Sequence, residues 1–201
     1  MSSIDENIFE WINGFVGESA VLDRIMIWLA NDYFIPVSMS LIMLAIWFMG
    51  KDREEREVLQ RSLIVAFISI GSACGFVLAV SQLNWQGHPF EELAYMPDVT
   101  NAVDKIFYPI VDPTFPSNTS AVTFAAAAGV WQGNRKLGLL LFIPATLMPL
   151  AKVYAAVYWP SDVVAGAILG ILTAYFIKLI MPLFEPIVGR TLKICRKLCL
   201  A

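Results

Sequence analysis

Two short segments of the sequence combine charged and hydroxyl side chains beside long apolar runs. The first extends from Lys105 to Thr119 and the second from Lys152 to Asp162. Ionisable side chains at membrane depth are costly and usually mark function. We therefore expect both segments to lie on the same side of a membrane. Their cations could attract an anion, and their hydroxyl and carboxylate groups could take part in its chemistry.

The spacing of residues within these segments is specific. Lys105 is followed after six residues by Asp112-Pro113, then come Pro116-Ser117-Asn118-Thr119, and Ala151-Lys152 precede Tyr158 and Asp162. In order and spacing the segments resemble the three motifs of the type 2 phosphatidic acid phosphatase (PAP2) superfamily, K-x6-R-P, P-S-G-H and S-R-x5-H-x3-D. The resemblance covers nearly the whole chain and implies a PAP2-like helical bundle around one extracytoplasmic phosphate site.

The departures from the family pattern fall on its catalytic positions. The resemblance implies that the third motif supplies a histidine nucleophile oriented by an aspartate, and that the second motif's histidine protonates the leaving group. Tyr158 and Thr119 occupy the two histidine positions, while Asp162 is retained. A threonine hydroxyl does not titrate near neutral pH, as general acid catalysis requires. A phenol titrates near pH ~10 and would need strong activation, so we expect a degenerate member lacking both catalytic histidines.

Phosphate binding is expected to be weakened as well. The resemblance leaves Lys105, Ser117 and Lys152 as a phosphate-binding remnant, but Asp112 replaces the arginine of the first motif. Two unit charges 4 Å apart interact by about 4 kcal/mol at an effective dielectric near 20, so Asp112 would oppose a phosphate. We expect an ion-pair cluster of Lys105, Lys152, Asp112 and Asp162 that closes the site.

The same residues also have purely structural interpretations. Ser117 and Thr119 are suited to cap the helix that follows them, and Asp162 is suited to cap the next. Lys105 and Lys152 could instead extend their ammonium groups to the membrane interface. Both interpretations remain open at the level of the sequence.

Two further residue types were considered for chemistry. His88, the only histidine, could replace a lost catalytic histidine if it folded over the site, but we expect a solvated loop residue. Cys195 and Cys199 could be lipidated or could bind a metal, although two cysteines without a histidine make a weak site. We expect no metal, no cofactor and no nucleic-acid partner.

The elements that would position these residues are membrane helices. The chain has 201 residues, of which 58% are hydrophobic and 15% charged, whereas a soluble domain carries about a quarter charged residues. A span needs about 20 apolar residues. The sequence thus predicts an all-α integral membrane protein of about five transmembrane helices. They are expected at about 33–50, 61–83, 119–133, 137–157 and 161–181.

The remaining segments complete a single membrane domain over residues 1–201. Residues 1–28 are predicted to form an interfacial helix, 84–118 an extracytoplasmic loop and 182–201 a basic cytoplasmic tail. The acidic start of the chain predicts no cleaved signal peptide. Most Lys and Arg fall in turns and in the tail that the positive-inside rule assigns to the cytoplasm, which puts the site outside a bacterial or archaeal cell membrane.

Three glycine pairs at four-residue spacing predict close approach of helices. They are Gly71 with Gly75, Gly129 with Gly133, and Gly166 with Gly170. We expect them to pack within the chain rather than at a dimer face.

These observations favour a non-catalytic membrane protein: a scaffold, a subunit of a larger membrane complex, or a binder of lipid or polyprenyl phosphates. The alternative is a lipid-phosphate phosphatase, of the phosphatidic acid or polyprenyl pyrophosphate type, with a site rearranged around Tyr158 or His88. Membrane lipids are the expected partners in either case. A small transporter has little support, because the polar residues cluster at one face.

Overall fold

The computed structural model describes residues 3–82, 88–89 and 114–198, and within these residues it contains helices and no strand. Most of the predicted 84–118 loop, including Lys105 and Asp112, lies outside the described residues. The elements are α1 (Ser3–Asn13), α2 (Ala20–Ala30), α3 (Phe34–Phe48), α4 (Arg53–Ser81), α7 (Asn118–Trp131), α8 (Arg135–Tyr154), α9 (Pro160–Ile180), the short 3-10 helix η1 (Met181–Phe184) and α10 (Glu185–Lys197). The all-α prediction is confirmed.

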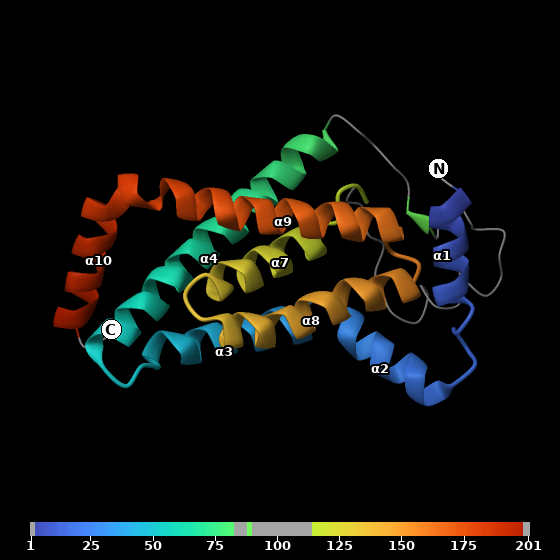
Figure 1. Cartoon of the computed structure of the whole chain (residues 1–201). Coiled ribbons are helices and arrows are strands. Elements are labelled where there is room, and N and C mark those ends of the chain that lie inside the picture. The colour runs from blue at the N-terminus through green and yellow to red at the C-terminus, as the bar shows by residue number, and fades with distance from the viewer. Residues whose placement is uncertain (1–2, 83–87, 90–113, 199–201) are drawn as a thin grey trace.

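Helix α7 is the centre of the bundle (Figure 1). It packs against α4, α8 and α9, and its alanines are almost completely buried. Small side chains suit this position because they let neighbouring backbones approach closely. The main apolar core forms where α3, α4, α7 and α8 meet, around Met43, Leu63, Val130 and Leu141.

Two of the three glycine pairs explain how α7 fits between its neighbours. A Cβ on Gly129 would lie 2.5 Å from Cα of Ala66 in α4. A Cβ on Gly170 would collide with the backbone oxygen of Ala121 in α7. These contacts confirm packing within the chain for the pairs of α7 and α9.

The third pair behaves differently. A Cβ on Gly71 or on Gly75 would meet no atom within 4 Å. The expectation that this pair packs against another helix of the chain is therefore wrong. Both glycines lie on an open face of α4, where neighbouring side chains such as Phe67 and Leu78 are also exposed.

Helices form at all five positions where spans were predicted, but a count of five spans is not confirmed. By length and composition three helical stretches of the described chain could cross a membrane: Arg53–Ser81, Arg135–Tyr154 and Pro160–Lys197. A fourth is obtained if α2 and α3, which are bent by 57° at their junction, count as one span. At about 1.5 Å per residue, α7 is too short to cross ~30 Å of hydrocarbon.

Large apolar side chains cover the outside of the bundle. Leu41, Phe67, Leu172 and Leu179 are each more than half exposed. Soluble proteins rarely leave such extensive apolar surface uncovered, whereas lipid tolerates it. With the long apolar helices, this surface identifies an integral membrane protein.

The two ends of the bundle differ. Helix α10 crosses one end, and α1 and α2 lie at the other (Figure 1). The segment predicted to lie in the interface at residues 1–28, which the sequence allowed to be one or two helices, forms the two helices α1 and α2, and the predicted tail contains α10. Ion pairs join α10 to α4: Arg61 to Glu185 at 2.6 Å and Arg196 to Glu57 at 2.9 Å.

Candidate functional site at the α7, α8 and α9 termini

The second and third motif segments meet at the end of the bundle near α1. The Ser117 backbone N–H donates to the Asp162 carbonyl oxygen at 3.1 Å. One turn further on, the Ser120 hydroxyl donates to the Val163 carbonyl oxygen at 2.7 Å. These bonds fix the first turn of α7 against the first turn of α9. The structure therefore brings Ser117 and Asp162 together, as their shared side of the membrane predicted.

The capping interpretation is confirmed for two residues. The Ser117 hydroxyl accepts from the Ser120 backbone N–H at 3.3 Å and caps α7. The Asp162 Oδ2 accepts from the Trp159 backbone N–H at 3.0 Å and so closes the first turn of α9. Thr119, in contrast, lies inside the first turn of α7, so the expectation that it caps the helix is wrong.

Lys152 forms an ion pair with a residue that the sequence analysis missed. Its side chain is only 4% exposed, and its Nζ lies 2.5 Å from Oδ1 of Asp32. This position excludes an ammonium group extended to the membrane interface, one of the alternatives left open above. Asp32 stands between the apolar segments that become α2 and α3, and an acidic residue between two such segments was the available signal.

The Tyr158 ring lies near both Lys152 and His88. The Lys152 Nζ is 5.7 Å from the centroid of the Tyr158 ring, and the His88 and Tyr158 ring centroids are 6.4 Å apart. His88 is 3% exposed, so the expectation of a solvated loop residue is wrong. A histidine therefore lies beside the position where the third motif of the family carries its nucleophile.

One hydrogen bond indicates which nitrogen of the His88 ring carries a hydrogen. Nδ1 lies 2.8 Å from the carbonyl oxygen of Val157. A carbonyl oxygen can only accept, so Nδ1 carries the hydrogen. In the neutral ring the lone pair is then on Nε2, the nitrogen that could act as a base or nucleophile.

Lys105 and Asp112, the remaining members of the predicted ion-pair cluster, lie outside the described residues. The cluster as a whole therefore stays a prediction. Within the described residues its other members have different main contacts: Lys152 binds Asp32, and Asp162 binds the Trp159 backbone.

The N-terminal helices are fastened onto this end of the bundle. Asp5 accepts from both the backbone N–H and the hydroxyl of Ser161, at 2.9 and 2.6 Å. Asn13 donates to the Tyr154 carbonyl oxygen at 3.0 Å, and Phe9 packs on Trp159 with ring centroids 5.1 Å apart. These contacts cover the turn between α8 and α9, which carries Tyr158.

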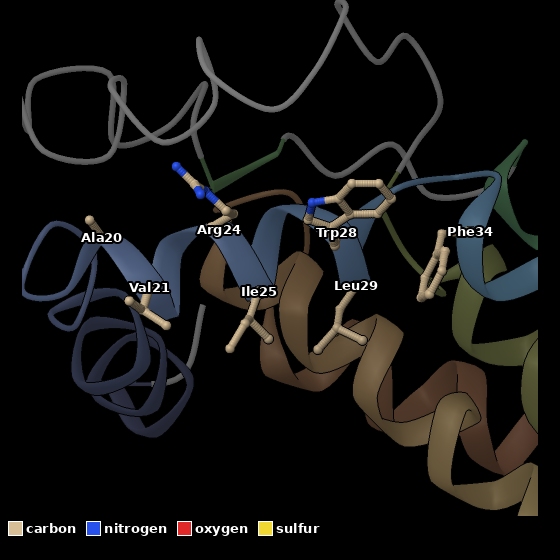
Figure 2. Close-up of a pocket in the computed structure, with 7 residues that line it drawn as sticks. All are labelled: Ala20, Val21, Arg24, Ile25, Trp28, Leu29 and Phe34. Carbon is tan, nitrogen blue, oxygen red and sulfur yellow. The ribbon is translucent and has the colours of Figure 1, made fainter.

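An apolar groove lies beside the site, between α2 and α3. Its volume is about 460 Å³, and Arg24 is its only charged lining residue among the described part of the chain. Figure 2 shows Arg24 and Trp28 on one side of α2 and Ile25 and Leu29 on the other. The groove ends at Phe34, two residues beyond Asp32.

Metal-ligating side chains do not cluster in the part of the chain that the structure describes. Among the residues it describes, no three His, Cys, Asp or Glu side chains are grouped so that they could hold an ion. Cys195 is a partly exposed free thiol, and Cys199 lies outside the described residues.

A family comparison agrees with this geometry. Residues 63–185 match the model of the PAP2 superfamily. The match covers more than half of the chain, and the chain therefore belongs to the PAP2 superfamily.

Curated relatives of the chain are bacterial proteins. It is 25% identical over 199 residues to the undecaprenyl-diphosphatase BcrC of Bacillus subtilis, covering 92% of this chain and 94% of that one. It is 27% identical over 175 residues to a putative undecaprenyl-diphosphatase, YbjG, of Escherichia coli, covering 86% and 80% of the two chains. These names support a lipid phosphatase over a non-catalytic scaffold.

Two solved structures share the fold. The LpxE structure of Aquifex aeolicus matches with a TM-score of 0.54 at 23% identity, covering 88% of this chain and 95% of that one. A PAP2-type phosphatidylglycerolphosphate phosphatase of Bacillus subtilis matches with a TM-score of 0.56 at 16% identity, covering 88% and 86%. At these identities the likeness concerns the fold alone, and it confirms the PAP2-like bundle.

Proposed function

We propose that the protein is a membrane phosphatase that removes the terminal phosphate of a lipid diphosphate at a rearranged PAP2 site. Thr119 and Tyr158 stand where the family has its two histidines, and His88 supplies the imidazole instead. The observation that carries the proposal is the burial of His88 beside Tyr158, with Nδ1 bonded to the Val157 carbonyl oxygen. The names of the curated relatives support the substrate class.

The chemistry assigned to His88 is attack on phosphorus by Nε2. The bond from phosphorus to the bridging oxygen breaks, and a lipid monophosphate leaves with the bonding electrons. Water then hydrolyses the resulting N–P bond and releases orthophosphate. Histidine is among the side chains that form covalent intermediates in nucleophilic catalysis.

The missing acid at Thr119 determines which substrates such a site can use. A leaving phosphate monoester has a second pKa of about 6, so it departs as an anion without being protonated. An alkoxide leaving group is far more basic and needs a general acid, which a threonine hydroxyl cannot be. We therefore expect lipid diphosphates to be hydrolysed much faster than lipid monophosphates.

Lys152 and the apolar groove have supporting roles in the proposed reaction. Lys152 contacts the transferred phosphate, and the apolar groove of α2 and α3 accepts part of a hydrocarbon chain, as mostly apolar clefts do. The cation distribution of the chain supports an extracytoplasmic side for this site.

A second candidate is a non-catalytic binder of lipid or polyprenyl phosphates, or a subunit of a larger membrane complex. It is favoured by the absence of histidine at positions 119 and 158 and by the partial neutralisation of Lys152 by Asp32.

Phosphate release from purified protein separates the two candidates. The substrates are undecaprenyl diphosphate, undecaprenyl phosphate and phosphatidic acid, and the variants are His88→Ala and Tyr158→Phe. We expect release from the diphosphate, reduced at least ~100-fold by His88→Ala. Tyr175→Phe is the matched control for the loss of a phenol, because Tyr175 is half exposed on α9.

Trapping the phosphoryl adduct identifies the nucleophile. An acid-labile adduct on His88 is expected, whereas an acid-stable adduct on Tyr158 would assign the attack to the phenol. If no substrate releases phosphate and partner chains co-purify at a fixed ratio, the phosphatase proposal is wrong and the subunit is favoured.

A further inference from the structure

Asp32 forms an ion pair with Lys152, the cation that a phosphate would need. Lys152 is almost inaccessible, with 4% of its side chain exposed, whereas Asp32 is 33% exposed. The carboxylate therefore lies on the more open side of the ion pair. An anion approaching Lys152 from that side would meet Asp32 first.

The backbone around Asp32 holds this carboxylate in place. The Asn31 Oδ1 accepts from the backbone N–H groups of Tyr33 and Phe34, at 2.8 and 3.2 Å, and so fixes the turn into α3. Helix α2 is held in turn, because the Tyr154 hydroxyl contacts Asp23 at 2.5 Å. Helix α2 and the turn into α3 thus hold Asp32 against Lys152. There its carboxylate competes with any external anion as an intramolecular ligand.

We propose that Asp32 competes with phosphate anions for Lys152 as an intramolecular ligand, so that only anions that bind Lys152 strongly displace it. This inference rests on the proposed function, since it takes Lys152 to be a phosphate-binding cation. A carboxylate carries one negative charge, whereas a phosphate monoester carries about −1.5 to −2 near pH 7. A diphosphate carries more charge still and is the stronger competitor.

The competition has a consequence for affinity. Both anions need Lys152 released from Asp32, so the carboxylate lowers their apparent affinities by the same factor. Removal of the Asp32 charge should therefore raise the affinities for orthophosphate and pyrophosphate together. A purely structural ion pair would leave both affinities unchanged.

The test measures anion binding to the full-length protein in detergent micelles. Sodium orthophosphate and sodium pyrophosphate are titrated at constant ionic strength, and binding is followed by the shift in thermal unfolding temperature. Asp32→Asn is compared with wild type and with Asp23→Asn. The control makes the same substitution in helix α2, where it changes the contact with Tyr154 and leaves the contact between Asp32 and Lys152 in place.

We expect Asp32→Asn to bind both orthophosphate and pyrophosphate at least 10-fold more tightly than wild type. Asp23→Asn should keep the wild-type affinities. Equal affinities in wild type and Asp32→Asn, or the same change in both variants, would overturn the proposal. If Asp32→Asn does not fold, Asp32→Glu keeps the charge and should keep the wild-type affinities, and a 10-fold gain in affinity there would overturn it.

Binding and turnover separate this inference from the proposed function. If the affinities shift as expected and no lipid phosphate is hydrolysed, Asp32 competes at a non-catalytic binding site and the proposed hydrolysis is wrong. If undecaprenyl diphosphate is hydrolysed but the anion affinities do not respond to Asp32→Asn, hydrolysis stands and the competition is wrong.

Discussion

At the scale of single residues, the site combines motif residues with residues from elsewhere in the chain. The Tyr158 ring lies near the His88 imidazole and the Lys152 ammonium group. The Asp162 carboxylate closes the first turn of α9. Capping bonds thus hold the start of α9, and in the proposed function the imidazole for phosphate chemistry comes from His88.

Asp5 provides a test of how strongly the N-terminal helix is fastened to this site. Replacing Asp5 by alanine removes two hydrogen bonds to Ser161 and leaves a backbone N–H of α9 without its acceptor. We expect a loss of about 1–2 kcal/mol of stability, which corresponds to roughly 2–8 °C in the unfolding temperature. Thermal unfolding in detergent measures it. Glu6→Ala removes the same charge from an exposed neighbour and should change little, and equal shifts would contradict the assignment.

The sequence could identify some members of the site and not others. Ser117 and Asp162 were predictable because each lies within a short motif. Each makes its capping hydrogen bond with a residue three positions away at the start of a helix. Asp32 and His88 were not, because their contacts with Lys152 and Val157 join residues 120 and 69 positions apart. Spacing within a motif says nothing about such contacts, which depend on how α2 and the segment at His88 fold back onto the bundle.

At the scale of elements, α7 shows how composition determines packing. It is short and rich in small residues, and its neighbours bring glycines to the contacts. The sequence predicted helices at all five apolar segments because apolar runs of this length favour helices. The predicted count of five spans is not confirmed, because a short helix at the centre of a bundle can be as apolar as a helix that crosses the membrane.

Gly170 and Gly71 offer a matched comparison of this packing. A methyl group at Gly170 would collide with the α7 backbone at Ala121, which cannot move without shifting the helix. We expect Gly170→Ala to cost about 1–3 kcal/mol of stability. Gly71→Ala faces open space and should be neutral or stabilising by up to about 1 kcal/mol, since alanine is the better helix former. Thermal unfolding of both variants measures the difference, and a Gly170→Ala protein as stable as wild type would contradict the close contact.

At the scale of the whole molecule, the candidate site and the basic helix α10 lie at opposite ends of the bundle (Figure 1). Helix α10 carries Arg190, Lys193, Arg196 and Lys197, and lysine and arginine near membrane helices favour the cytoplasmic side. From the same rule we expect the site on the opposite side. A lipid diphosphate would then have to be presented there for hydrolysis to occur.

Thiol labelling tests this orientation. In a variant with Cys74 and Cys199 replaced by alanine, Cys195 on α10 is the remaining thiol and is partly exposed. We expect a membrane-impermeant maleimide to label Cys195 in inverted vesicles and not in right-side-out vesicles. In a cysteine-free background, Glu18→Cys places an exposed thiol beside α1 and α2, and it should give the reverse pattern. If both thiols react from the same side, the bundle does not cross the membrane between α10 and the site, and a lipid diphosphate would be approached from the cytoplasm.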